Sequence, residues 1–157
     1  MSFLDKANTV APADFNRWLV PPAALAVHLS IGQIYAYSVF NAPLTKLIGI
    51  THSAPEDWAL ATVGWVFSIA LAVLGASAAL FGTWMERVGP RKAMFVAACC
   101  FGAGFLVAAF GVHAHNIWLV YLGNGVIGGV GLGLGYIGPV STLIKWFPDK
   151  PVMATGL

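Results

Sequence analysis

"GTWMERVGPRK", from Gly82 to Lys92, gathers three cations and one anion in a chain of which only 9% of the residues are charged. Hydrophobic residues make up 59% of the 157 residues, and the formal net charge is +2. In ordinary soluble domains about a quarter of the residues are charged. The composition therefore places the chain in a lipid bilayer. The small net charge belongs to membrane loops, so no nucleic-acid partner is expected.

Four long stretches around this charged segment contain no Asp, Glu, Lys or Arg. A hydrocarbon core of ~30 Å is crossed by ~20 helical residues, and each stretch is long enough. We predict an all-α, polytopic membrane helix bundle that follows a polar N-terminal segment, residues 1–17. Its four transmembrane helices are expected at about 18–45, 58–82, 93–112 and 116–144, and a fifth helix begins at about 151.

The distribution of Lys and Arg predicts how the bundle is oriented. Of the eight such residues, Lys46 follows the first helix, and the other seven fall on the opposite side. These seven are Lys6, Arg17, Arg87, Arg91, Lys92, Lys145 and Lys150. The positive-inside rule makes their side cytoplasmic. We expect a multi-pass protein of the cell membrane, with residues 1–17 and the 82–92 loop in the cytoplasm.

Two connections between the predicted helices contain residues that indicate how the next helix begins or packs. In "SAPEDW", Ser53 is expected to cap the second helix, with Pro55 in its first turn and Glu56 and Asp57 facing the positive end of the helix dipole. The connection "HAHN" at residues 113–116 is very short. It predicts an antiparallel hairpin whose two helices pack side by side.

Metal and cofactor motifs are not supported. Cys99 and Cys100 are adjacent in a predicted helix, where they cannot easily bridge, and no Cys/His spacing typical of zinc occurs. Gly133, Gly135 and Gly138 satisfy GxGxxG, but the preceding strand and the following acidic residue of a nucleotide site do not occur. We expect no metal, no cofactor and no catalytic residues, and therefore no enzyme.

The helix at 116–144 carries many glycines. One stripe at four-residue spacing and a second stripe beside it predict that neighbouring backbones approach on more than one face. The stripes are Gly125, Gly129, Gly133 and Gly128, Gly131, Gly135. Tight packing explains them, and so does a helix that bends and slides in a transporter.

The first helix has a polar face on which His28, Gly32 and Tyr35 recur at i, i+4 and i+7. Polar groups inside a membrane usually point toward a bundle interior or a cavity. Tyr35 is read as a cavity residue or as an interfacial or packing residue. His28 is read as a proton-coupling group or as a hydrogen-bonded structural histidine. Gln33 and Tyr37 lie on other faces and are expected to join helices.

The opening stretch also fits the pattern Gly-x-x-x-(Asp/Glu)-(Arg/Lys)-x-Gly-x-(Arg/Lys)-(Arg/Lys). This resembles the loop between helices 2 and 3 of the major facilitator superfamily, which has twelve helices. The resemblance implies a gate latch that holds the N-terminal half against the C-terminal half. Its residues would be Gly82, Glu86, Arg87, Gly89, Arg91 and Lys92. Glu86 would offer its negative charge to a helix N-terminus, and Gly89 and Pro90 would form the turn. The main partner of the latch would lie outside this sequence.

Two further stretches resemble the oxalate/formate antiporter family: "GQIYAYSVFNAPL" in the first helix and "GYIGPVSTLIKWFPDKPVMATG" at residues 135–156. In that family aromatic side chains of the N-terminal half line a central anion site, while the cations come from C-terminal helices. The resemblance implies that Tyr35 and Tyr136 line the substrate path. Gln33 stands one place earlier than the usual glutamine of the family.

These observations predict the N-terminal part of a secondary active transporter for a small organic anion, a mono- or dicarboxylate, working by alternating access. The expected partners are this anion, the lipid bilayer and the C-terminal half of the transporter. The apolar stretch after Pro151 reads as a fifth helix cut short. The alternative is a four-helix membrane protein that does not transport and acts as an anchoring or assembly subunit.

Overall fold

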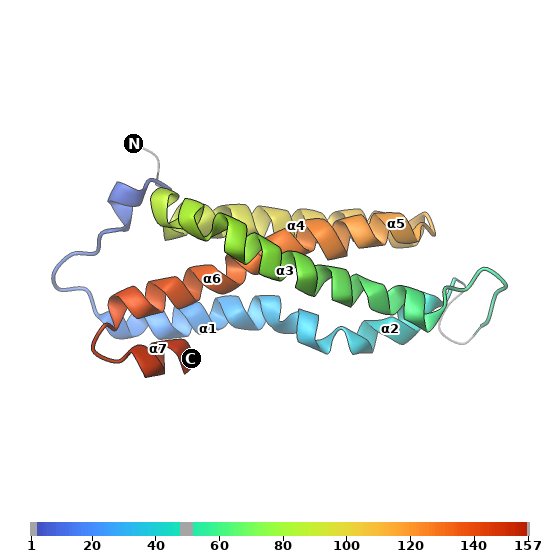
Figure 1. Ribbon diagram of the computed structural model, residues 1–157, viewed down its shortest axis with the longest axis horizontal. Helices are drawn as coiled ribbons and strands as arrows, with labels where there is room; N and C mark the ends of the chain where they lie inside the picture. Colours follow the sequence, from blue (N-terminus) through green and yellow to red (C-terminus); the bar gives the residue numbers. More distant parts are fainter. Residues whose placement is uncertain (1–2, 48–51, 157) are drawn as a thin grey trace.

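The computed structural model describes residues 3–47 and 52–156, and the regular elements among them are all helical. Four apolar helical segments are long enough to cross a membrane: Arg17–Ala36, Leu60–Val88, Pro90–His113 and Ile117–Trp146. They run side by side along one long axis (Figure 1). For the described residues, this confirms the predicted all-α bundle with four membrane-spanning helices.

The first span is divided, where a continuous helix over 18–45 was expected. A short 3₁₀ turn, η2 (Arg17–Leu19), leads into α1 (Val20–Ile31), which continues as the 3₁₀ segment η3 (Gly32–Ala36) and then as α2 (Ser38–Thr45). The Tyr37 N–H donates to the Ile34 carbonyl at 3.2 Å, three residues back instead of four. Because this tightens the pitch, the side chains on the two sides of η3 point in directions that a straight helix would not give them.

The second span, α3 (Leu60–Val88), begins after the acidic residues that were expected to start it. Its N-cap is Ala59, so the predicted cap at Ser53 is wrong. The Asp57 carboxylate instead accepts hydrogen bonds from the Leu47 N–H at 2.9 Å and from Lys46 Nζ at 3.0 Å. These bonds hold the pKa of Asp57 below its usual range, the Leu47 N–H first and Lys46 second. A backbone donor and an ammonium group thus replace the helix dipole as its partners.

The expected 82–92 loop is mostly helix. The α3 helix continues to Val88, and α4 (Pro90–His113) begins two residues later. Gly89, at φ +90°, makes the whole turn. The expected helix ends at 82 and 93 were therefore wrong, because uncharged length marks the hydrocarbon core and a helix can extend beyond it into the charged interface.

The third and fourth spans form the expected tight hairpin. After α4, the turn at 114–116 leads into α5 (Ile117–Val120), and the Asn116 side chain accepts from the Trp118 N–H at 3.0 Å as a helix cap. A π-helical segment, η4 (Tyr121–Ile127), then passes into α6 (Gly128–Trp146). Wider π turns often occur where a helix presents functional side chains.

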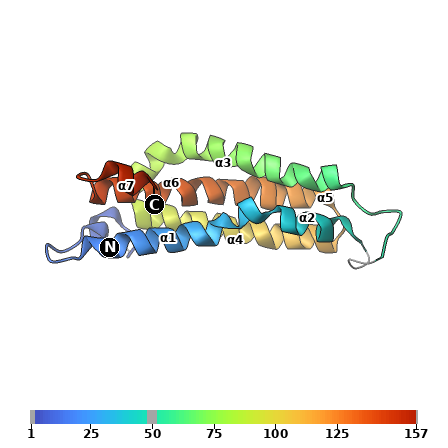
Figure 2. The same cartoon turned by 90° about the horizontal axis from the view of Figure 1, so that it is seen from below.

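Figure 2 shows α6 lying between α3 and α4. Both predicted faces of close approach are present. A Cβ added at Gly129 would lie 2.9 Å from the Val73 side chain of α3, and one at Gly131 would lie 2.6 Å from the Phe101 backbone nitrogen of α4. The prediction that backbones approach on more than one face of this helix is confirmed.

A last helix, α7 (Pro151–Gly156), lies at the end of the bundle where α1 begins (Figure 1). The linker before it is anchored by the fully buried Phe147, which packs with Ala24 and Leu143. Arg17 forms two hydrogen bonds with the Asp149 carboxylate, at 2.9 and 3.1 Å. The start of the first span is thereby tied to the end of the fourth.

Candidate functional site

A small cavity lies between the first span, α3 and α6. The first span contributes most of its wall, and Leu74, Leu132 and Tyr136 complete it. Its volume is about 160 Å³. Because each molecule of liquid water occupies about 30 Å³, a solute of only a few non-hydrogen atoms fits.

The cavity brings together three residues that the sequence singled out. His28 and Tyr35 come from the first span, and Tyr136 comes from α6. The rings of His28 and Tyr136 meet edge to face, with centroids 5.6 Å apart and an interplanar angle of 83°. Gly32 lies in the same wall, so the prediction that His28, Gly32 and Tyr35 share a face is confirmed. Their role in binding stays a prediction.

The tautomer of neutral His28 follows from its hydrogen bond. Nδ1 lies 3.1 Å from the Ala24 carbonyl oxygen. A carbonyl only accepts, so we assign the ring hydrogen to Nδ1, which leaves Nε2 with a free lone pair. His28 lies ten residues after Trp18, or ~15 Å along a helix, and is therefore near the middle of the hydrocarbon core.

The two tyrosines differ in exposure. Tyr35 is 69% exposed and Tyr136 is 44% exposed, although both belong to apolar spans. Their rings thus border an open side of the cavity. A phenol combines an apolar ring with a hydroxyl that can donate a hydrogen bond. Together with a half-buried histidine, they give an otherwise apolar cavity an aromatic edge with a few polar atoms.

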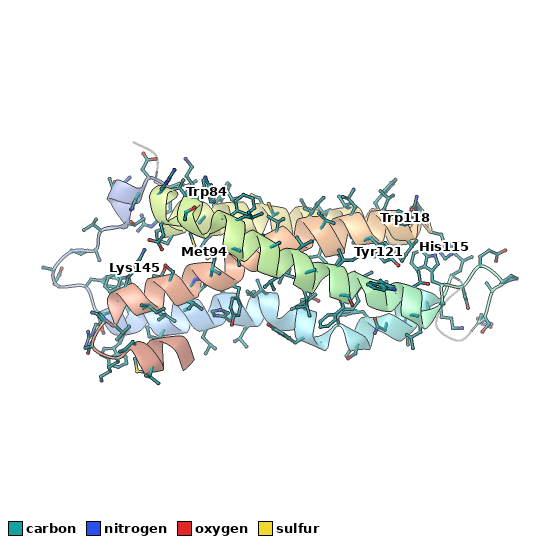
Figure 3. The ribbon with its side chains drawn as sticks, viewed as in Figure 1. Trp84, Met94, His115, Trp118, Tyr121 and Lys145 are labelled. Atoms are coloured by element: carbon teal, nitrogen blue, oxygen red, sulfur yellow. The ribbon has the colours of Figure 1, made fainter. Side chains whose placement is uncertain are left out.

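The expected latch residue Glu86 lies at the end of the bundle that carries most of the cations. Its carboxylate accepts a hydrogen bond from Ser141 Oγ at 2.8 Å and pairs with Lys145 Nζ. Both partners belong to α6. Glu86 thus joins α3 to α6 within the chain, and the partner of the latch in the C-terminal half stays a prediction. Figure 3 shows Lys145 at the same end as Trp84 and far from His115 and Trp118.

The turn at Gly89 is covered by the N-terminal segment. Lys6, in the 3₁₀ turn η1 (Lys6–Thr9), donates from Nζ to the Glu86 carbonyl oxygen at 2.7 Å. A Cβ added at Gly89 would lie 3.0 Å from the Lys6 Cβ. Arg91 stacks over the Phe3 ring at 4.7 Å. The positive φ of Gly89 thus allows the tight turn, and the absence of a side chain there leaves room for Lys6 to pack against it.

The remaining latch residues are placed differently. A Cβ added at Gly82 would meet no described atom within 4 Å, so no neighbouring helix of the described chain lies against it. Arg87 and Lys92 are exposed. The structure groups Glu86, Gly89 and Arg91 around the N-terminal segment, and it leaves the other three on the surface.

Sequence reasoning missed Lys6, Ser141 and Lys145 as partners of Glu86. The only available signal was that both lysines fall on the same predicted side of the membrane as Glu86. From the sequence, Gln33 and Tyr37 were expected only to join helices. Together with Asn124 of η4, they line a second cavity of about 230 Å³. Within the described residues, Gln33 Nε2, the Tyr37 hydroxyl and Asn124 Oδ1 are buried without a hydrogen-bond partner.

Four apolar spans, a cavity among them and a charged tie at one end define the chain as a polytopic membrane protein of the helical-bundle class. The sequence model of the Major Facilitator Superfamily matches residues 11–157. The chain belongs to the major facilitator superfamily. This confirms the first resemblance, whereas the narrower likeness to the oxalate/formate antiporters stays a prediction.

The chain is similar to several curated transporters. It is 27% identical over 143 residues to the "Uncharacterized MFS-type transporter YhjX" of Escherichia coli (strain K12), covering 90% of this chain and 33% of that protein. It is 33% identical over 130 residues to monocarboxylate transporter 1 of Mus musculus, covering 82% and 25%. It is 28% identical over 141 residues to monocarboxylate transporter 11 of Homo sapiens, covering 89% and 28%. The chain thus spans a quarter to a third of the length of these relatives.

Proposed function

We propose that the chain forms the N-terminal portion of a secondary active transporter that moves a small organic anion, a mono- or dicarboxylate, by alternating access. The observation that carries the proposal is the cavity of about 160 Å³ where His28, Tyr35 and Tyr136 meet. None of the described residues that line it is Asp, Glu, Lys or Arg. Hydroxyl and imidazole groups bind a carboxylate here without a fixed charge that would hold it permanently. The similarity to proteins named monocarboxylate transporters supports the same substrate class.

In this proposal the protein performs no covalent chemistry. A tyrosine hydroxyl donates to the carboxylate while its ring covers the carbon skeleton. The tie between Glu86 and α6 stabilises one arrangement of the cytoplasmic end, and its release accompanies rocking against the C-terminal half. The oxalate/formate likeness makes oxalate and formate natural test substrates beside pyruvate.

The transporter lies in the cell membrane with residues 1–17 in the cytoplasm. The support is the seven-to-one distribution of Lys and Arg and the gathering of Lys6, Arg17 and Lys145 at one end of the bundle. The check is cysteine labelling in a variant without Cys99 and Cys100. An impermeant thiol reagent added outside intact cells should label cysteines at His52 and His113 and leave one at Thr83 unlabelled. Labelling at position 83 would reverse the orientation.

The test of function is uptake of radiolabelled pyruvate, formate and oxalate by proteoliposomes that contain the protein expressed from its own gene. We expect saturable uptake of at least one of these anions that unlabelled anion inhibits. Liposomes prepared in parallel without protein give the background. Uptake at background level for all three anions would overturn the proposal and favour the anchoring or assembly subunit.

A further inference from the structure

We propose that His115 is a pH-sensitive clasp that holds the connection before α3 against the turn between α4 and α5, and holds it more firmly when its imidazole ring is protonated. His115 lies at the end of the bundle opposite Lys145 (Figure 3), and it is not among the residues that line the cavity of His28. In the orientation proposed above, the clasp responds to the pH outside the cell.

The backbone of the turn is unusual for a histidine. Among the described residues, His115 is the one non-glycine residue with a positive φ, 49°. Its N–H donates to the Val112 carbonyl oxygen at 3.1 Å, and the Asn116 N–H donates to the Gly111 carbonyl oxygen at 2.8 Å. This is the Schellman arrangement of a helix end, whose left-handed position is usually glycine. Histidine costs more free energy than glycine in this conformation, which indicates that its side chain has a role.

The side chain of His115 joins two segments that are distant in the sequence. Its ring stacks face to face on the Trp58 ring, with centroids 4.4 Å apart and an interplanar angle of 10°. Its Nε2–H donates to the Glu56 carbonyl oxygen at 2.8 Å. Because a carbonyl only accepts, the hydrogen of the neutral ring lies on Nε2, and Nδ1 keeps the lone pair to which a proton adds. Trp58 is itself tied to the first span, since its N–H donates to the Thr45 carbonyl oxygen at 2.9 Å.

Protonation of His115 strengthens each of these contacts. An imidazolium over an indole face gains a cation–π attraction, and its N–H forms a charge-assisted hydrogen bond with the carbonyl oxygen. The ring also follows the C-terminal end of α4, where the helix dipole favours a positive charge. Histidine ordinarily changes charge between about pH 5 and pH 8. The three effects therefore stabilise the clasp at the acidic end of this range, and their contribution is lost as the pH rises.

The neighbouring charges favour the imidazolium. Lys46 Nζ pairs with the Asp57 carboxylate at 3.0 Å. The Leu47 N–H and Lys46 hold the pKa of Asp57 below its usual range, so this pair carries no net charge from pH 5 to pH 8. The Glu56 carboxylate adds one negative charge. The remaining titratable side chains on the described parts of these segments are those of His52, His113 and Tyr121. Both histidines are exposed, so water and salt screen their charges.

The test is hydrogen–deuterium exchange, followed by mass spectrometry, of peptides that span 52–60 in the protein expressed from its own gene, in detergent at pH 5.5 and pH 8. Each rate is divided by the intrinsic rate of an unstructured peptide at the same pH. The parent protein should protect this segment about two- to fivefold more strongly at pH 5.5 than at pH 8. His115→Gln keeps a side-chain N–H for the carbonyl oxygen but cannot take a proton, so its protection should be equal at both pH values.

His115→Gly separates the clasp from the turn, because glycine suits the positive φ and the hairpin should fold at least as well. It should increase exchange in 52–60 at both pH values and leave peptides that span 111–118 protected. His52→Gln and His113→Gln are the matched controls, since both side chains are exposed, and each should keep the pH dependence of the parent protein.

Three results would overturn the proposal. Protection of 52–60 in His115→Gly equal to that in the parent protein would show that His115 does not hold the connection. Equal protection of the parent protein at pH 5.5 and pH 8 would remove the pH sensitivity. A pH dependence that survives in His115→Gln and disappears in His52→Gln or His113→Gln would assign the sensitivity to one of those histidines.

Discussion

The fourth span and the first span differ in how far the rest of the chain covers them. In the apolar window of Ile117–Trp146, 56% of the residues are buried, against 11% in that of Arg17–Ala36. Glycines let α3 and α4 lie directly against the fourth span, whereas the first span has larger side chains and a 3₁₀ segment in its course. The fourth span is therefore the more covered of the two, and we treat it as a fixed floor against the less covered first span, the wall.

The candidate site contains residues from both the more covered and the less covered span. Tyr136 stands on the floor, and His28 and Tyr35 stand on the wall. An alternating-access transporter needs a wall that moves against something that keeps its shape. The predictions below test first the floor, then the division of the site between floor and wall, and then the ties at the end of the bundle that carries most of the cations.

The largest effect is expected for the floor. Gly131→Ala places a methyl group 2.6 Å from the Phe101 backbone nitrogen, and a backbone atom cannot turn away as a side chain can. Overpacking of this kind costs ~2–3 kcal/mol. Gly75→Ala in α3 is the matched control, because no described atom lies within 4 Å of its added Cβ and alanine favours a helix over glycine. Thermal unfolding in detergent micelles compares the two.

Gly131→Ala should melt clearly below the parent protein, and Gly75→Ala should melt at or slightly above it. If the two variants melt together, the contact between the fourth span and α4 can relax, and the view of a fixed floor is wrong.

The next effect concerns substrate affinity. Tyr136→Phe removes a hydroxyl from the floor, and loss of one charge-assisted hydrogen bond should weaken carboxylate binding by ~1.5–3 kcal/mol, or roughly tenfold or more. Tyr35→Phe should have the smaller effect, since Tyr35 is 69% exposed against 44% for Tyr136 and stands on the less covered wall. Equilibrium binding of radiolabelled pyruvate, normalised to protein abundance, measures both.

Tyr121→Phe is the control for these variants. The Tyr121 hydroxyl donates to the Thr62 carbonyl oxygen at 2.7 Å, away from the cavity, so its loss should leave the affinity unchanged. Unchanged affinity in both Tyr35→Phe and Tyr136→Phe would make the two rings packing groups. A larger effect at Tyr35 would move the centre of the site onto the wall.

The features that could be predicted from the sequence are those that depend on neighbouring residues along the chain. Uncharged length and glycine spacing are local features, so the four spans and the close-packed faces of the fourth were predictable. The partners of Glu86 were not, because Ser141 and Lys145 lie 55 and 59 residues away along the chain. The expected cap at Ser53 failed for a similar reason: the Leu47 N–H and Lys46 hold the Asp57 carboxylate. The cavity follows from how the spans cross, which periodicity within one helix does not determine.

A smaller effect is expected where the N-terminal segment covers the end of α3. Lys6→Met keeps the apolar stem against Gly89 but removes the ammonium that donates to the Glu86 carbonyl oxygen at 2.7 Å. The lost bond is exposed and is worth ~0.5–1 kcal/mol, so the amides that it protects should exchange about two- to fivefold faster. Hydrogen–deuterium exchange followed by mass spectrometry of peptides that span 85–92 measures this change.

Lys6→Arg should keep amide exchange as slow as in the parent protein, because a guanidinium also donates to the carbonyl. Equal exchange in the parent protein and Lys6→Met would show that the N-terminal segment does not hold the turn at Gly89, and that the tie from Glu86 to α6 is sufficient there.

The smallest effect concerns the salt bridge between Arg17 and Asp149, which joins the start of the first span to the linker after the fourth. The hydrogen bonds from Arg17 hold the pKa of Asp149 below the ordinary value of 3.8. A carboxyl with a lowered pKa in the folded state adds stability that is present above its unfolded pKa and is lost as the pH falls through its folded pKa. The parent protein should therefore lose a little thermal stability between pH 5 and pH 2 through this pair. The loss is small because the side chains of Arg17 and Asp149 are 41% and 45% exposed, where water and salt screen the charges.

Asp149→Asn should lack this part of the acid sensitivity, while Asp14→Asn, in the polar N-terminal segment, should retain it. Melting temperatures in detergent at pH 5 and pH 2, with the parent drop minus the variant drop as the quantity compared, decide the matter. A difference of zero would mean that the salt bridge adds no stability. Packing would then hold the two segments together, through Arg17 at 4.9 Å from the Phe147 ring centroid and through Trp18 against the same ring.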